Sequence, residues 1–233
     1  MSRFRPPLGF SLFTLFGVAL LWSLCGWQLG RRAEAAEERL TYEERLLLPA
    51  FNAEQPPDDP ALRRVFVSGR PDWDNVQRVL GKYMWSQQGV QLLVPVRAGE
   101  GLVLVDIGWV PEDEADAILV RERGAGSLRT YAGIARPFGE PPDAMVRPGY
   151  WRAVAPLAMG QALGTTIPSW VLIDGEGLPS EAPISDRVPP ISGWRTAPSQ
   201  RPHTEYAFTW FSLGSILVAV WLSMSFSRLS TGP

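Results

Sequence analysis

Residues 8–30 read LGFSLFTLFGVALLWSLCGWQLG and contain no charged side chain. A second charge-free stretch, residues 206–227, reads YAFTWFSLGSILVAVWLSMSFS near the other end of the chain. An α-helix needs about 20 apolar residues to cross a hydrocarbon core of roughly 30 Å, and a helix satisfies every backbone N–H and C=O within its own segment. These two stretches therefore predict a pair of transmembrane helices that flank one large loop.

The charges beside the two spans predict how the hairpin crosses the membrane. Arg3 and Arg5 lie in the N-terminal tail, residues 1–7, and Arg228 lies in the C-terminal tail, residues 228–233. Because positive residues in short tails favour the cytoplasmic side, and a long loop translocates largely regardless of its charge, we expect both termini to be cytoplasmic. No Arg-rich, acid-poor leader precedes the first span, which favours the bacterial inner membrane and hence a periplasmic loop.

A cleaved signal peptide is the alternative for residues 8–30, because an Arg-containing start precedes an apolar run. The run is longer than the apolar region of a signal peptide, which has about 7–15 residues. Arg31 and Arg32 also occupy the positions where small residues would mark a cleavage site. We therefore expect the segment to remain as a membrane anchor.

The composition limits what the loop can do. The chain has a net charge of -2 at pH 7 and a sequence pI near 5.6, so it lacks the basic footprint of a nucleic-acid-binding protein. Cys25 is the single cysteine, which excludes an intramolecular disulfide. A loop of about 175 residues is long enough to bury its own hydrophobic core as one domain.

The loop divides into three parts by composition. Residues 31–60 begin with good helix formers and end in an acidic, Pro-rich stretch, so they predict a helical extension of the first span followed by a linker. Residues 61–178 contain branched apolar runs separated by turns, which predicts a β-rich domain. Residues 179–205 contain repeated prolines and predict an extended strap that returns the chain to the membrane, with one strand around Val188.

Within the β-rich part, the apolar runs predict individual strands and two short helices. The expected strands are residues 64–69, 76–85, 90–96, 102–110, 127–135 and 169–173, of which the third and fourth form a hairpin. The expected helices are residues 111–120, which begin with a proline and an acidic first turn, and residues 151–163. The predicted fold class is therefore α+β, with an antiparallel sheet and short helices flanked by two transmembrane helices.

The residues required for most enzyme chemistry are missing. His203 is the only histidine, so a site with several imidazoles is impossible, and a Ser-His-Asp triad could form only around this one residue at the membrane surface. The Gly-x-Gly pieces at residues 124–126 and 175–177 lack a third glycine, and a Walker-type lysine is absent. A membrane-anchored periplasmic enzyme would need a cleft of ionisable residues in the loop, and the sequence indicates none. We therefore expect that the protein is not an enzyme.

Polar and aromatic side chains gather at the end of each span that faces the loop. A helix that starts by His203 places His203, Tyr206 and Trp210 on one face, because positions three, four and seven apart are neighbours. Trp27 and Gln28 lie at the same level of the first span. Trp and Tyr also collect at membrane surfaces without a binding role, so an aromatic belt with a solvated histidine is the alternative. An imidazole at this boundary could instead ligate haem iron.

Three motifs resemble the surfeit-locus family of assembly factors for haem–copper cytochrome oxidase. Gly-Trp-Gln at residues 26–28, followed by two arginines, is similar to the family's Gly-x-Trp-Gln-x-x-Arg signature. Residues 104–111, Leu-Val-Asp-Ile-Gly-Trp-Val-Pro, resemble its loop motif ending Arg-Gly-Trp-Val-Pro, with Asp106 and Ile107 in place of the usual Asn and Arg. Residues 203–213, His-Thr-Glu-Tyr-Ala-Phe-Thr-Trp-Phe-Ser-Leu, match its His-x-x-Tyr-Ala-x-Thr-Trp-Phe entry to the second span.

The resemblance implies a role in the maturation of the catalytic subunit of the oxidase. It also implies transient binding of haem a, with His203 as the candidate iron ligand and Tyr206, Trp210, Trp27 and Gln28 around the macrocycle between the spans. The expected partners are the catalytic subunit of cytochrome c oxidase, other assembly factors or haem a synthase, within the membrane.

A scaffold without a cofactor is the rival to haem binding. In that case the two spans bind an oxidase subunit, and the loop recruits further factors. Gly17, Gly214 and Ser215 are small residues within the spans that permit close contacts between helices. Both functions therefore remain open from the sequence.

Overall fold

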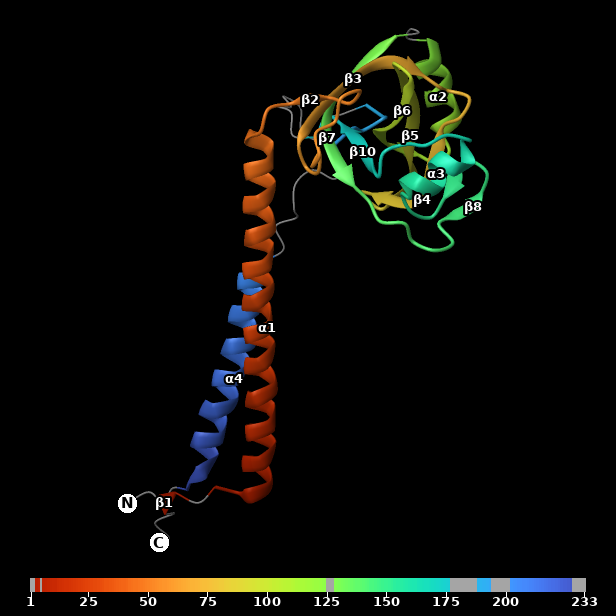
Figure 1. Cartoon of the computed structure of the whole chain (residues 1–233). Coiled ribbons are helices and arrows are strands. Elements are labelled where there is room, and N and C mark those ends of the chain that lie inside the picture. Colours follow the sequence, from red (N-terminus) through yellow and green to blue (C-terminus); the bar gives the residue numbers. More distant parts are fainter. Residues whose placement is uncertain (1–2, 5, 125–127, 177–187, 194–201, 228–233) are drawn as a thin grey trace. The chain divides into compact units, whose positions relative to one another are not determined.

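The computed structural model describes residues 3–4, 6–124, 128–176, 188–193 and 202–227 (Figure 1). The chain forms two compact units. One contains residues 1–40 and 198–233, and the other contains residues 41–197. The predicted C-terminal tail lies outside the described residues, and so does most of the predicted strap.

In the described part of the chain, two helices are long and apolar enough to cross a membrane, namely α1 (Leu8–Leu47) and α4 (His203–Ser225). α1 continues without a break through the charged residues after its apolar part, as the run of Ala, Glu, Arg and Leu predicts. Its 40 residues make it about 60 Å long, about twice the thickness of a hydrocarbon core. The predicted pair of membrane-length helices is therefore confirmed.

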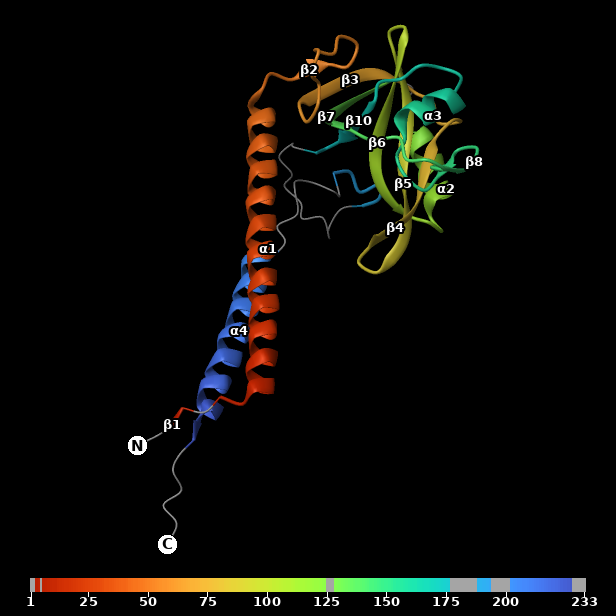
Figure 2. The ribbon, with the colours of Figure 1, turned by 60° about the horizontal axis from the view of Figure 1, so that its bottom comes forward.

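The apolar part of α1 and the whole of α4 form an antiparallel helical hairpin, and the two helices lie side by side in both views (Figure 1, Figure 2). Trp221 Nε1 donates a hydrogen bond to Ser11 Oγ at 2.9 Å across the hairpin. Farther along α1, a Cβ on Gly17 would lie 2.8 Å from Leu217 Cδ2, so the glycine allows a close approach there. At the chain ends, β1 (Arg3–Phe4) pairs antiparallel with β11 (Phe226–Ser227).

The second unit is built around one sheet. Its elements are β2 (Phe51–Asn52), β3 (Arg64–Pro71), β4 (Gln77–Met84), β5 (Gln87–Ala98), β6 (Gly101–Pro111), α2 (Ala115–Gly124), β7 (Arg129–Pro137), β8 (Met145–Arg147), β9 (Tyr150–Trp151), α3 (Pro156–Ala162) and β10 (Trp170–Asp174). The strand order is β2-β3-β7-β10-β6-β5-β4-β9-β8, and β3 also pairs with β5. This additional pairing closes β3, β7, β10, β6 and β5 into a ring, so the sheet forms a small barrel.

The barrel separates two hydrophobic cores. Side chains on one face of all five ring strands fill the interior, for example Val67, Val94 and Val105. The alternate residues of the same strands, such as Leu93 and Leu104, face outward and pack under α3 in a second core. Because successive side chains of a strand point to opposite faces, the β5–β6 hairpin is buried on both faces.

The structure confirms the α+β class and changes several details. Most strand pairs are antiparallel as predicted, but β10 pairs parallel with β6, β2 with β3, and β4 with β9, so the sheet is mixed. The helix predicted to start at Pro111 is α2, which begins at Ala115, because Pro111 still pairs with Gly89 at the end of β6. Trp151 belongs to β9, and α3 begins only at Pro156. Of the strand predicted around Val188, residues 188–193 are described and form one bridge, from residue 191 to Trp109.

Candidate functional site

The entry to α4 carries the first candidate site. Pro202 precedes the helix, and its carbonyl oxygen accepts a hydrogen bond from the Tyr206 N–H at 3.2 Å, which closes the first turn. His203 therefore lies at the first position of the helix, and its half-buried side chain reaches α1. There, His203 Nδ1 lies 2.8 Å from Oε1 of Gln28, a buried side chain. The structure thus joins two of the predicted site residues directly.

With the Gln28 amide oriented by its carbonyl oxygen, this hydrogen bond corresponds to one tautomer of the imidazole. A carbonyl oxygen only accepts, so Nδ1 of His203 carries the proton and donates it to Gln28 Oε1. In a neutral imidazole the other nitrogen, Nε2, then keeps its lone pair. Histidines that ligate metals usually donate their second ring N–H to a carboxylate or carbonyl in this way, which holds the ring in place. The arrangement fits a histidine prepared to ligate iron through Nε2.

The three predicted aromatic residues take different positions around this pair. Trp210 is half-buried on the same helix face, beside the buried Ala207. Trp27 and Tyr206 are largely exposed, at 58% and 52% of their surface, so they lie on the outer surface of the hairpin. An apolar ligand bound from the lipid side could contact both rings.

The hairpin is tightly packed farther along the same face. A Cβ on Gly214 would lie 2.5 Å from Trp22 Nε1, and Trp22 stacks on Phe211 with ring centroids 6.0 Å apart. The small residues Gly17 and Gly214 therefore sit at close helix contacts, as the sequence suggested. The site around His203 lies at the end of this close contact.

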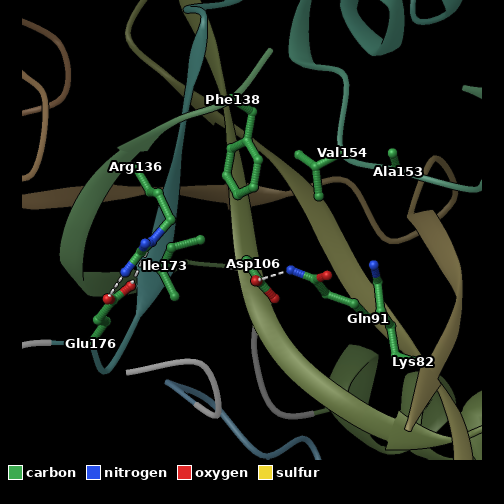
Figure 3. A pocket seen from close by; sticks show the side chains of 9 residues that line it. All are labelled: Lys82, Gln91, Asp106, Arg136, Phe138, Ala153, Val154, Ile173 and Glu176. Atoms are coloured by element: carbon green, nitrogen blue, oxygen red, sulfur yellow. Dashed lines mark hydrogen bonds and ion pairs between the residues drawn. The ribbon is translucent and has the colours of Figure 1, made fainter. Parts of the chain in front are cut away.

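A second candidate site lies in the barrel domain. It is a cavity of about 310 Å³ at the outward face of β5 and β6 (Figure 3). Its polar lining comes from Lys82, Gln91, Asp106, Arg136 and Glu176. Its apolar lining comes mainly from Phe138, Val154 and Ile173. The sequence analysis expected no cleft of ionisable residues in the loop, and the structure forms one because strands distant in sequence lie side by side in the sheet.

Asp106 is the most unusual residue of this cavity. Only 2% of its surface is exposed. Its Oδ2 accepts a hydrogen bond from Gln91 Nε2, and its Oδ1 accepts one from the Gly108 N–H at 2.9 Å. Burial raises the pKa of the Asp106 carboxyl to about 7, and the negative charges of Asp174 and Glu176 act in the same direction. Asp106 is therefore an acid that can change its charge near neutral pH.

The opposite side of the cavity holds an ion pair between a buried carboxylate and a partly exposed guanidinium. Glu176 is completely buried, and both of its carboxylate oxygens accept hydrogen bonds from Arg136. Tyr42 Oη donates to the same carboxylate at 3.3 Å. Nearby, burial raises the pKa of Asp174 to about 6, while its Oδ1 accepts the N–H of Ala132 at 3.2 Å. The barrel domain therefore concentrates ionisable groups at one place.

One sequence signal could have indicated this cavity. Asp106 interrupts the apolar strand Leu-Val-Leu-Val-Asp-Ile, at a position that alternates with the outward-facing Leu102 and Leu104. A charged residue in the middle of a strand buried on both faces needs a partner or a function. Its partner, Gln91, lies on the other strand of the predicted hairpin, so the register of that hairpin was needed to find it.

Comparisons with known proteins agree with the motifs. A sequence model of the SURF1 family matches residues 15–215. A SURF1-like protein of Rickettsia bellii (strain RML369-C) is 23% identical over 217 residues, which cover 90% of this chain and 88% of that protein. The matched region includes His203 and Gln28 as well as the whole barrel.

Proposed function

This chain belongs to the SURF1 family, and we propose that it is an assembly factor for haem–copper cytochrome oxidase that holds haem a beside His203 during maturation of the catalytic subunit. The observation that carries the proposal is the hydrogen bond between His203 Nδ1 and Gln28 Oε1. It leaves Nε2 as the nitrogen with a lone pair, at the entry of a membrane-length helix.

The residues present suit a holding role. Haem a supplies an iron that an imidazole nitrogen ligates, and His203 Nε2 would be that ligand. Gln28 orients the imidazole ring and keeps the proton on Nδ1. His203 is the only histidine of the chain, so no second imidazole of this chain would ligate the iron. A single histidine ligand would suit a carrier that releases the group to the next protein.

The exposed aromatic side chains support binding from the lipid side. Haem a is large and apolar, and Trp27 and Tyr206 offer exposed ring faces at the level of His203. Trp210, half-buried on the same face of α4, would contact the edge of the macrocycle. A site that opens to lipid allows an apolar group to enter and leave without crossing water.

The proposed setting is the bacterial inner membrane, with both termini in the cytoplasm and the barrel domain in the periplasm. The catalytic subunit of the oxidase, and further assembly factors or haem a synthase, would then bind the hairpin within the membrane. The arginines of the N-terminal tail support this orientation.

Co-expression with the enzymes of haem a synthesis tests the haem proposal. The purified full chain should show the absorption bands of haem a, and the His203→Ala variant should contain at least about tenfold less bound haem. Thr204→Ala, an exposed neighbour on the same helix turn, is the matched control and should retain wild-type haem content. If His203→Ala retains as much haem as the wild type, the ligand role is wrong.

The close helix packing favours a second candidate, a scaffold that holds no cofactor. Trp22 covers Gly214 so closely that a larger residue there must displace the indole or separate the helices. Under this alternative, Gly214→Leu reduces oxidase content in cells strongly, whereas His203→Ala reduces it little. Haem binding predicts a strong loss for His203→Ala as well.

A further inference from the structure

The cavity in the barrel domain has the size and lining of a small-molecule site. Its volume of about 310 Å³ lies at the lower end of the range of about 300–1,000 Å³ that is typical of ligand pockets. Phe138 and Val154 form an apolar wall, Ile173 lies between Asp106 and the Arg136–Glu176 pair, and Gln91 and Lys82 lie on the other side of Asp106 (Figure 3). A small ligand with one apolar part and a few polar atoms matches this division.

The charge of Asp106 is not explained by its structural hydrogen bonds. An asparagine could accept the Gly108 N–H through its own side-chain oxygen and could pair with the amide of Gln91, and it would carry no charge into the interior. A buried carboxylate is much more costly than a buried amide unless a positive group compensates it. The ionisable residue at this position therefore points to a cationic group that enters the cavity.

Gln91 and Lys82 complete the polar side. Gln91 donates its Nε2 hydrogen to Asp106, so its carbonyl oxygen is an acceptor at the cavity. Lys82 reaches the cavity from β4, on the far side of Gln91 from Asp106 (Figure 3). An ammonium group has three donors, so Lys82 can bind a ligand carboxylate in addition to another acceptor. Arg136 and Glu176 neutralise each other and leave that wall without net charge.

We propose that this cavity binds a free apolar amino acid as a zwitterion, with the ligand ammonium at Asp106 and the Gln91 carbonyl, the ligand carboxylate at Lys82, and the side chain against Phe138, Val154 and Ile173. A carboxylate accepts up to about four hydrogen bonds, and Asp106 uses two of these sites within the protein. The acid and the base that line the cavity lie on either side of one glutamine, which suits two opposite charges carried by one small molecule.

Binding should be linked to protonation of Asp106. The charged groups around it are Lys82 from β4, Arg136 from β7, and Asp174 and Glu176 at the end of β10. Burial places the pKa of Asp106 at about 7 in the free protein, and a ligand ammonium binds the ionised form. Affinity should therefore rise about tenfold from pH 6 to pH 8, with release of a proton on binding.

Equilibrium dialysis of the purified full chain in detergent with radiolabelled L-leucine tests the proposal. Leucine amide lacks the carboxylate and N-acetylleucine lacks the ammonium, so each should compete at least about tenfold more weakly than leucine. Leucyl-leucine separates the two charges by a further residue and should also compete weakly. Lys82→Met should weaken leucine binding, and Lys82→Arg should preserve it better because the positive charge remains.

Asp106→Asn should abolish most leucine binding and its pH dependence, whereas Asp113→Asn, an exposed acid outside the cavity, should change neither. Absence of leucine binding at millimolar concentration would overturn the proposal. So would equal competition by N-acetylleucine, which would indicate a site for carboxylates only. If Asp106→Asn does not fold, the variants Lys82→Met and Lys82→Arg still test the proposal. Equal leucine binding by Lys82→Met and the wild type would exclude the proposed binding mode in this cavity. The assay contains no haem, so its result is independent of the haem experiment.

Discussion

The helical hairpin and the barrel domain each place a glutamine against an ionisable side chain, and the two pairs behave differently. In the hairpin, Gln28 Oε1 accepts a hydrogen bond from a half-buried imidazole at a helix end. In the barrel, Gln91 donates to a carboxyl group that is 2% exposed. Partial burial costs a neutral imidazole little solvation free energy, whereas a buried carboxylate loses the water that stabilises its charge. The first pair therefore orients an accessible ligand atom, and the second couples protonation to the stability of the fold.

The largest expected effect is on the pH dependence of barrel stability. The pKa of Asp106 is about 7 in the folded state, against about 3.9 in an unfolded chain, so the folded protein retains a proton that the unfolded chain has lost. Stability should therefore fall as pH rises from about 4 to about 7, by about 3 kcal/mol between pH 5 and pH 8 from Asp106 alone. Asp174, with a pKa of about 6, adds to the fall in the lower part of this range.

Urea unfolding of the full chain in detergent at several pH values measures this slope. In Asp106→Asn, the fall in the free energy of unfolding between pH 5 and pH 8 should be about 3 kcal/mol smaller. The variant should therefore be more stable than the wild type at pH 8. Asp113→Asn should leave the slope unchanged, because that side chain is exposed. An unchanged slope in Asp106→Asn would mean that Asp106 is ionised in the folded protein near pH 5.

The next effect concerns the donor to Asp106. Gln91→Leu removes one of the two hydrogen bonds to this carboxyl, which should destabilise the barrel by about 2 kcal/mol at pH 8, where the group is charged. The effect should be smaller at pH 5, where Asp106 is protonated. Gln88→Leu on the same strand is a suitable control, because Gln88 is exposed and its side chain bonds two surface residues, Glu112 and Tyr83. Equal losses at both pH values would point to packing instead of charge.

The contrast between the two sites also explains what could be predicted from the sequence. The hairpin follows from local information, since two charge-free stretches of membrane length are visible without any partner. His203 and Gln28 could be placed at one level because each is close to the end of its own span. Their contact then required only that the two helices run antiparallel.

The barrel cavity could not be predicted in the same way. The β5–β6 hairpin was predicted from two adjacent apolar runs, but the other neighbours of these strands were not, because a strand pattern does not specify its pairing partner. β10 inserts between β7 and β6, which brings Glu176 to Arg136 and to the side of Asp106. A cluster made by such long-range pairing leaves no spacing signal in the sequence.

A smaller effect is expected for the orienting partner in the hairpin. Gln28→Leu removes the acceptor for His203 Nδ1, so the imidazole can rotate and either nitrogen can carry the proton. Bound haem a should fall by about tenfold, as read from the absorption spectrum of the purified chain. Gln28→Glu keeps an acceptor oxygen and should retain most of the haem. Equal haem in the leucine and glutamate variants would show that Gln28 does not orient the ligand.

The smallest effect compares Trp27 with Trp22, a tryptophan that contacts α4. Trp27 is 58% exposed, so Trp27→Leu should leave the hairpin intact and reduce bound haem by about threefold, through loss of one ring contact with the macrocycle. Trp22→Leu is the matched comparison, since Trp22 covers Gly214 and stacks on Phe211. It should weaken the helix contact, measured as faster hydrogen exchange in α4, with haem loss only as a consequence. If Trp27→Leu accelerates exchange in α4 as much as Trp22→Leu does, Trp27 supports the hairpin, and the aromatic surface around His203 is structural.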